Sequence, residues 1–293
     1  MYQRDEKPAW FRYNPAGLAS MYGATLGVIG DWLSALDLPQ VVLQPQGTDA
    51  HEVALNVRMV HQARRCRRII AVGGGLEGYL EALHRALGRH HPPMMELVHH
   101  LRPNPDDLHI WLDPDWAYRS CEWLMRWAEE DGLVNPSVRQ AWRRTQLRFR
   151  QLWGAVERVR TLVQGKTYIA VHDAYRPLTR RLGMRSLGSL MPHEEHPPSL
   201  QTLRAMVERG RKERVAFVLS REPTGVGATV ARLLGVPLLL ADTLEHREPT
   251  RDYFQRYLDL LATLEAGAAA RSNAIVSTPL YVPSVRGQRR PAG

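Results

Sequence analysis

The sequence predicts an α/β fold of two lobes with parallel sheets, joined by one long, rigid helix. Short apolar runs alternate with amphipathic helical patterns along the chain, which is typical of helices that cover parallel sheets. One helical pattern in mid-chain, from 136 to 163, runs much longer than the others. At 1.5 Å per residue it would span roughly 40 Å. We therefore expect it to connect two lobes rather than to lie within one.

The expected strands are short apolar runs, and the expected helices lie between them. The strand-like runs cover residues 41–43, 68–72, 168–171, 215–219 and 236–240. The helical patterns cover residues 77–87, 115–130, 199–209 and 226–234. Short strands that are apolar throughout favour parallel pairing with both sheet faces covered.

The long helix has a clear beginning and end. Asn135-Pro136 supplies a capping side chain and a proline in the first turn, and Gly165 follows the last apolar position; both are typical helix boundaries. These boundaries divide the chain into an N-terminal α/β lobe (1–134), the linking helix (135–164), a C-terminal α/β lobe (165–285) and a loose tail rich in Arg, Pro and Gly (286–293).

Charge and hydropathy exclude several classes of protein. The chain has 39 Lys and Arg residues against 30 Asp and Glu, a formal charge of +9. Such a balance can mark a nucleic-acid partner. Here the arginines are scattered over many predicted helices without interleaved aromatic residues, so we expect solvated faces and no nucleic acid. No run approaches the roughly 18 to 20 apolar residues of a membrane span, and no signal peptide pattern is visible in this chain.

The cysteines and one group of histidines leave alternatives open. Cys66 and Cys121 form no CxxC motif, so they are either a disulfide or two buried free thiols. The histidines between residues 84 and 100 form either a metal-collecting loop or a solvated connector. His193 and His196 are three positions apart and flanked by prolines, which differs from the helical HExxH motif of zinc proteases.

A glycine-rich turn, Gly73-Gly74-Gly75-Leu76-Glu77-Gly78, lies between a predicted strand and a predicted helix. It fits the GxGxxG pattern of dinucleotide-binding folds. The acidic residue expected about 20 positions later, after a second strand, has no clear counterpart, because Glu96 follows two prolines. On this motif alone, a dinucleotide enzyme and a plain tight turn are both open interpretations.

Three further histidines lie beside carboxylates at strand ends or sharp turns. They are His51, His109 and His172, and Asp242 ends a fourth apolar run. Ligands bind beyond the carboxyl ends of strands in open α/β sheets, and three neutral imidazoles with one carboxylate suit a zinc ion. Two of these residues precede the long helix and two follow it, so the sequence predicts a metal site in a cleft between the lobes.

These segments resemble the zinc- and manganese-specific substrate-binding proteins of metal ABC transporters. The most specific likenesses are Asp107-Leu108-His109-Ile110-Trp111-Leu112-Asp113-Pro114, similar to a DPHIWLDP segment, and His172-Asp173-Ala174-Tyr175, similar to HDAF. Asp49-Ala50-His51-Glu52, the glycine turn and Pro197-Pro198-Ser199 also have counterparts in the same order. Ala50 and Leu108 stand where the family has prolines.

The resemblance implies a binding protein and not an enzyme, with the ion held between two lobes. The rigid linking helix indicates that these lobes move little. It implies His51, His109, His172 and Asp242 as ligands of Zn²⁺ or Mn²⁺. Manganese-binding members tend to have a carboxylate where His172 stands, so the imidazole favours zinc. The implied function is high-affinity capture of the ion and delivery to an ABC permease and ATPase complex, by a monomer in the periplasm or at the cell surface.

Some roles remain alternatives. Glu77, Asp113 and Asp173 are candidates to orient the ligand histidines, or else they cap helices and form turns. A zinc hydrolase would need an open coordination position and a base; Glu52 or Asp173 would serve if Asp242 did not bind the ion. A surface adhesion protein on the same fold is a further alternative, for which no motif here encodes a partner.

Overall fold

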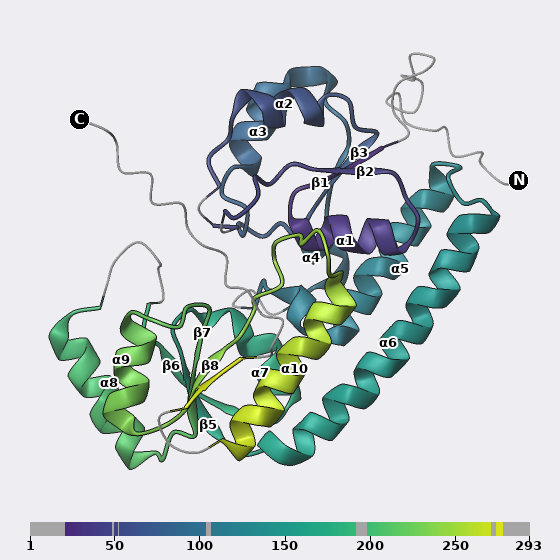
Figure 1. Cartoon of the computed structure of the whole chain (residues 1–293). Coiled ribbons are helices and arrows are strands. Elements are labelled where there is room, and N and C mark those ends of the chain that lie inside the picture. The colour runs from purple at the N-terminus through teal and green to yellow at the C-terminus, as the bar shows by residue number, and fades with distance from the viewer. Residues whose placement is uncertain are drawn as a thin grey trace, which may run out of the picture.

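The computed structural model describes residues 21–48, 50–51, 53–103, 107–191, 198–270 and 274–277. In these ranges the chain forms two α/β lobes with parallel sheets, and the long helix α6 (Pro136–Val163) joins them (Figure 1). The predicted fold class is confirmed. Among the described residues, no helix combines the length and apolar character needed to cross a bilayer. The predicted tail, 286–293, lies outside the described ranges.

The first lobe contains a four-stranded sheet in the order β2-β1-β3-β4. Central strand β1 pairs Tyr22 with Gln40 on one side and with Arg68 on the other. The strands are β1 (Tyr22–Ala24), β2 (Gln40–Val42), β3 (Arg68–Ala71) and β4 (Met94–Glu96). The helices are α1 (Gly27–Ala35), α2 (Val57–Ala63), α3 (Leu80–Leu87), α4 (Leu97–Leu101) and α5 (Pro114–Glu130), with short 3-10 helices η2 (Gly88–His90) and η3 (Ile110–Leu112).

The second lobe contains a five-stranded sheet in the order β6-β5-β7-β8-β9. Its central strand pairs Tyr168 with Phe217 in parallel register. The strands are β5 (Thr167–Ala170), β6 (Arg185–Ser189), β7 (Phe217–Ser220), β8 (Leu238–Leu240) and β9 (Ile275–Val276). The helices are α7 (Arg176–Arg181), α8 (Leu200–Lys212), α9 (Val226–Leu234) and α10 (Tyr253–Ala269), with the 3-10 helix η4 (Asp173–Tyr175).

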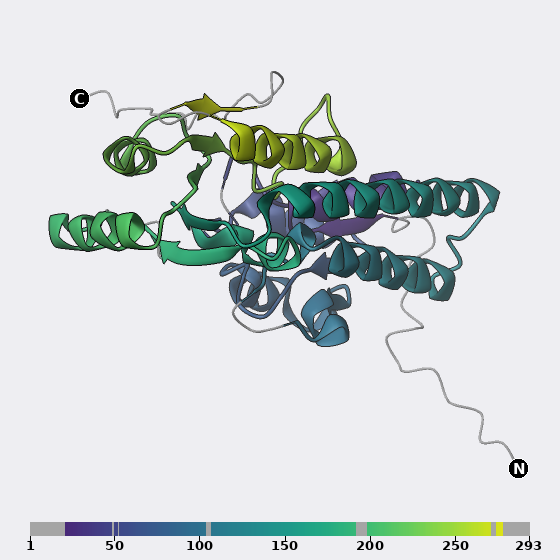
Figure 2. The same cartoon turned by 90° about the horizontal axis from the view of Figure 1, so that it is seen from below.

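The linking helix begins where the sequence predicts. The Asn135 side chain accepts a 3.0 Å hydrogen bond from the Val138 amide, and Pro136 occupies the first turn, so the cap satisfies one of the amides left unpaired at a helix start. Figures 1 and 2 show α10 running beside α6 in both views. The linker is therefore packed against a helix of the second lobe rather than standing free.

One hydrophobic cluster extends through both lobes. It contains Trp32 and Trp111 from the first lobe, Phe149 from α6, and Tyr253 and Leu260 from α10, all buried. Two smaller clusters cover the remaining face of each sheet. Because the lobes share one packed core, opening them widely would expose apolar surface to water. This packing supports the expectation of small lobe movements.

Both cysteines are free, buried thiols, so a disulfide between Cys66 and Cys121 is absent. Burial raises the pKa of the Cys66 thiol to about 12, and burial likewise holds the pKa of Cys121 well above its usual value. Thiolates are the reactive and metal-binding form. Neither cysteine is therefore an activated nucleophile at neutral pH.

Candidate metal centre

Three histidines from three different loops meet at one point between the lobes. His51 lies in the loop after β2, His109 directly precedes η3, and His172 lies between β5 and η4. One ring nitrogen from each lies within 4.8 Å of the other two. The ring centroids are 5.4 Å apart for His109 and His172, 5.5 Å for His51 and His109, and 5.8 Å for His51 and His172. The three imidazoles thus form a nearly equilateral triangle.

The triangle has a buried side and an open side. His109 is only 8% exposed, and its Nε2 atom is shielded from solvent, as are both ring nitrogens of His172. His51 is exposed at the surface. An ion can therefore enter from solvent past His51 and reach the ring nitrogens of His109 and His172, which are shielded from water.

The segment that follows His109 is held by the second lobe and by α10. Trp111 Nε1 donates a 2.6 Å hydrogen bond to the Thr243 carbonyl. The hydroxyls of Tyr253 and Tyr257 donate 2.7 Å hydrogen bonds to the carbonyls of Trp111 and Leu112. These buried bonds fix the backbone beside His109, and the Trp111 ring lies edge-on to the His109 ring at 5.1 Å.

The segment that follows His172 is fixed in a similar way. Tyr175 donates a 2.6 Å hydrogen bond from its hydroxyl to the Ala241 carbonyl. Arg180, on α7, lies 2.5 Å from the buried carboxylate of Asp107. The neighbouring Arg181 pairs with Asp115 and lies 3.8 Å from Asp113. The two ligand-bearing segments are thus tied to each other across the lobe boundary by charge-assisted contacts.

The fourth predicted ligand, Asp242, is not part of this group of closely spaced ligand atoms. Its carboxylate instead accepts hydrogen bonds from Arg256 of α10, from Nε to Oδ2 at 2.9 Å and from Nη2 to Oδ1 at 3.0 Å. The structure therefore brings together three of the four predicted ligands. The Asp242 carboxylate is turned toward α10 because a bidentate guanidinium partner is present there.

Two of the three carboxylates considered as orienting groups are bound to backbone amides. Glu77 accepts 2.9 Å hydrogen bonds from Val72 and Gly73, which holds residues before α3 in a turn and explains why the helix predicted from 77 begins only at Leu80. Burial raises the pKa of Glu77, although these bonds oppose the rise.

Asp113 caps α5, where it accepts a 2.8 Å hydrogen bond from the Asp115 amide. Burial raises the pKa of Asp113 despite this bond and the nearby Arg181 charge. Glu77 and Asp113 thus have the turn and cap roles named as alternatives. The Asp173 side chain lies outside the part of the chain that the structure describes.

The glycine-rich turn offers no cradle for a pyrophosphate. The amides of Val72 and Gly73 are occupied by the Glu77 carboxylate, and the Gly74 amide donates to the Glu96 carboxylate at 3.2 Å. Dinucleotide sites leave such amides free for phosphate oxygens. Here two carboxylates already occupy that position, so the geometry favours the plain-turn interpretation.

The other histidine group disperses in space. His84 and His91 pair through Nε2 atoms 2.9 Å apart, His99 faces Glu96 at 3.8 Å, and the His100 ring lies 4.2 Å from the Trp123 ring. These side chains turn to different partners rather than to one point. Asp49, Glu52, His193 and His196 lie outside the described residues.

Sequence reasoning missed the residues that hold the ligand loops. Trp111 and Tyr175 follow their ligands by two and three positions, so a search for aromatic residues just after each histidine would have found them. Tyr253, Tyr257 and Arg256 lie on one face of α10, and only packing of that helix brings them to the site.

Comparisons with known proteins agree with this arrangement. A family model described as the zinc-uptake complex component A, periplasmic, matches residues 24–267. Similar solved structures include the substrate-binding protein FpvC from Pseudomonas aeruginosa in complex with Mn²⁺, at 16% identity and a TM-score of 0.74, over 86% of this chain and 99% of that one. The periplasmic zinc-binding protein TroA from Treponema pallidum aligns at 16% identity and 0.72, over 86% and 100%.

A third similar structure is the laminin-binding protein Lmb of Streptococcus agalactiae, described as a bifunctional protein with adhesin and metal-transporting activity. It aligns at 17% identity and a TM-score of 0.71, over 86% of this chain and 100% of that one. No curated protein sequence matches the chain. At these identities the structural likenesses show the fold, and the family model shows the family.

Proposed function

Because the chain belongs to the family of periplasmic zinc-uptake complex component A proteins, we propose that it captures a divalent transition metal ion between its lobes, preferring Zn²⁺ to Mn²⁺, and delivers it to an ABC permease and ATPase complex. Proteins of this family bind substrates and are not enzymes. In this proposal the metal ion is the transported cargo, and the alternative of a zinc hydrolase is not favoured.

The observation that carries the proposal is the triangle of His51, His109 and His172. Imidazole nitrogen is a preferred ligand of zinc, at about 2.0 to 2.1 Å. Manganese prefers carboxylate and carbonyl oxygen, and the three imidazoles of the triangle supply only nitrogen. Zinc is therefore the favoured cargo of the two.

The surroundings of the triangle support capture rather than turnover. The hydrogen bonds of Trp111 and Tyr175 fix the two buried ligand segments before any ion arrives, so little conformational entropy is lost on binding. Exposed His51 gives a route by which the ion enters and leaves. We place the working protein in the periplasm or at the cell surface, as a monomer, where it can meet a permease.

The test is a titration of chelator-stripped protein with Zn²⁺ and, separately, with Mn²⁺. Calorimetry and Trp fluorescence monitor the binding. We expect one tight equivalent of zinc and weaker binding of manganese. His109→Ala should abolish the tight zinc equivalent. The matched control His100→Ala should keep it, because His100 packs against Trp123 and is not part of the triangle. Zinc binding that is indifferent to His109→Ala would contradict the proposal.

A further inference from the structure

The backbone of Asp242 is fixed between the two buried ligand segments. The carbonyl of Ala241, just before Asp242, accepts a hydrogen bond from the hydroxyl of Tyr175 in the His172 segment. The carbonyl of Thr243, just after Asp242, accepts a hydrogen bond from the indole N–H of Trp111 in the His109 segment. The main chain on either side of Asp242 is therefore anchored to both segments that carry ligands. Its carboxylate, however, is directed to Arg256 of α10.

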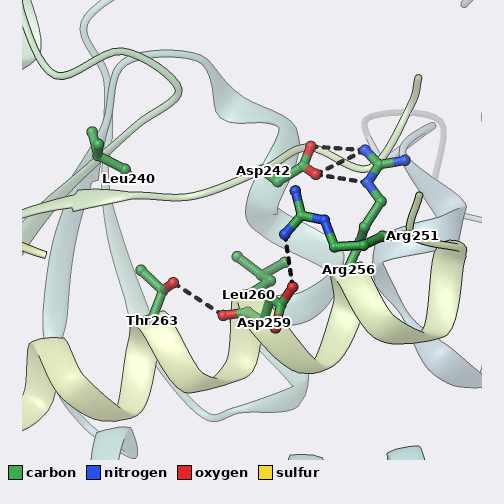
Figure 3. A pocket seen from close by; sticks show the side chains of 7 residues that line it. All are labelled: Leu240, Asp242, Arg251, Arg256, Asp259, Leu260 and Thr263. Atoms are coloured by element: carbon green, nitrogen blue, oxygen red, sulfur yellow. Dashed lines mark hydrogen bonds and ion pairs between the residues drawn. The ribbon is translucent and has the colours of Figure 1, made fainter. Parts of the chain in front are cut away.

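That carboxylate is fully engaged on the α10 side. Figure 3 shows Asp242 facing the guanidinium of Arg256, which contacts both carboxylate oxygens. The Leu244 amide adds a 2.8 Å hydrogen bond to Oδ1. A carboxylate has about four lone-pair sites, and hydrogen bonds occupy most of them here. A metal ion would have to displace these donors to reach the oxygens.

Arg256 in turn depends on Asp242. Its side chain is 2% exposed, and the other carboxylates near it are farther away, Glu248 at 3.8 Å and Asp31 at 3.9 Å. The remaining acidic neighbour in Figure 3, Asp259, is paired with Arg251 at 2.9 Å. Withdrawing Asp242 would leave the buried guanidinium with only these two more distant carboxylates, which is unfavourable.

We propose that Arg256 sets the metal selectivity of this protein by holding the Asp242 carboxylate away from the ion. The inference rests on the proposed function. The cargo then meets three neutral imidazoles, with its other coordination positions left to solvent. Ions that accept nitrogen donors readily, namely Zn²⁺, Ni²⁺, Co²⁺ and Cu²⁺, are bound, and Mn²⁺ is disfavoured because it lacks an anionic oxygen ligand.

The experiment is Arg256→Met in the full chain, which removes the guanidinium and keeps a long apolar side chain. We expect Mn²⁺ affinity to rise at least tenfold relative to Zn²⁺ affinity, because Asp242 becomes free to bind the ion. The absorption spectrum of bound Co²⁺ should change as an oxygen ligand joins. Adding Asp242→Ala to Arg256→Met should restore the wild-type ratio and spectrum.

The matched control is Arg148→Met. Arg148 of α6 forms a bidentate pair with Asp252, the N-cap residue of α10, with both N–O distances at 2.6 Å. Arg148 forms the same kind of ion pair but does not contact Asp242. The ratio of Mn²⁺ to Zn²⁺ affinity and the Co²⁺ spectrum of Arg148→Met should therefore match those of the wild type. A ratio that changes equally in both variants would show a general structural effect and overturn the inference.

A second variant keeps the proposal testable if Arg256→Met fails to fold. Asp242→Asn retains an acceptor oxygen for Arg256 but would be a poor metal ligand. We expect its zinc dissociation constant to stay within threefold of the wild type. A loss of tenfold or more would identify Asp242 as a ligand and overturn the inference. Wild-type protein that binds no metal would defeat the proposed function itself, which is a separate outcome.

Discussion

The amide of Val28 donates a 3.1 Å hydrogen bond to the carbonyl of Glu245, which joins the first turn of α1 in the first lobe to the loop after β8 in the second. The approach is close because the preceding residue is glycine. A Cβ atom on Gly27 would lie 2.3 Å from the Arg247 amide nitrogen and 2.5 Å from the His246 carbonyl carbon. The lobes can meet here only where a side chain is absent.

Gly27→Ala should therefore disrupt the lobe contact. Overpacking against backbone costs about 1 to 3 kcal/mol, so we expect the free energy of unfolding of metal-free protein to fall by about 2 kcal/mol, with weaker zinc binding. Urea unfolding measures the first effect. The matched control, Gly154→Ala in α6, meets only the Arg158 side chain at 3.7 Å and should stabilise the helix by roughly 0.5 to 1 kcal/mol. Equal effects in the two variants would contradict the lobe-contact argument.

Trp111→Phe should weaken both the fold and the metal site. The change removes the indole donor from the buried Thr243 carbonyl, and an unsatisfied buried acceptor costs about 1 to 3 kcal/mol. Zinc affinity should fall as well, because the backbone beside His109 loses an anchor. Denaturation and calorimetry test the two effects. Trp116→Phe is the control, since Trp116 lies half-buried on α5 beneath Arg119; a similar loss there would argue against a specific role for the hydrogen bond.

Asp131 should make stability depend on acid pH. It accepts hydrogen bonds from Arg68 at 2.7 Å and from Tyr22 at 2.9 Å, and pairs with Arg67 at 3.0 Å. Burial alone would raise the pKa of Asp131, but these partners outweigh it and hold the pKa below its usual value. The stabilisation is thus present above the unfolded pKa and lost as the pH falls through the folded pKa.

Asp131→Asn should consequently cost about 3 kcal/mol at pH 7, because it leaves Arg68 buried without its main partner. The difference from the wild type should shrink as the pH falls below about 4. Guanidinium unfolding at pH 7, 5, 4 and 3 would measure it. Glu129→Gln, which alters an exposed carboxylate in the last turn of α5, two residues before Asp131, is the control. A difference that stays constant with pH would refute the assignment.

Zinc affinity should fall steeply in acid. The three ligands bind as neutral imidazoles, so protons compete with the ion for their ring nitrogens as the pH falls. We expect a loss of at least tenfold in affinity between pH 7.5 and pH 5.5, measured by competition with a chelator of known affinity, while circular dichroism monitors the fold. Unchanged affinity over this interval would argue against imidazole ligation.

Several features of the fold and the site could be predicted from local sequence alone. The helix over 136–163 follows from its own cap and periodicity, and α9 (Val226–Leu234) was predicted with its observed bounds. His172 could be assigned to the site because it lies just past a strand of a parallel sheet, where ligands bind, and His109 because its segment, Asp107 to Pro114, resembles a metal-binding motif. In each case the signal lies within a few residues of the feature it predicts.

The features that sequence reasoning missed depend on distant partners. Asp242 has the sequence position expected of a ligand, yet its carboxylate is hydrogen-bonded to Arg256. Arg256 reaches it only because α10 packs beside β8 and the loop that follows. Short strands such as β1 (Tyr22–Ala24) and β9 (Ile275–Val276) carry too few residues for a periodic signal. Their pairing comes from the neighbouring strands rather than from their own sequence.

The hydroxyls of Tyr253 and Tyr257 anchor a loop that lies 142 and 145 residues earlier in the chain. Contacts of such long separation form late in folding, because loop closure must precede them. During synthesis the imidazoles emerge well before the helix that steadies the His109 loop. The His109 loop is consequently coupled to the C-terminal helix: a chain that ends before residue 253 lacks two of the three side-chain donors that hold this loop and keeps only the indole of Trp111.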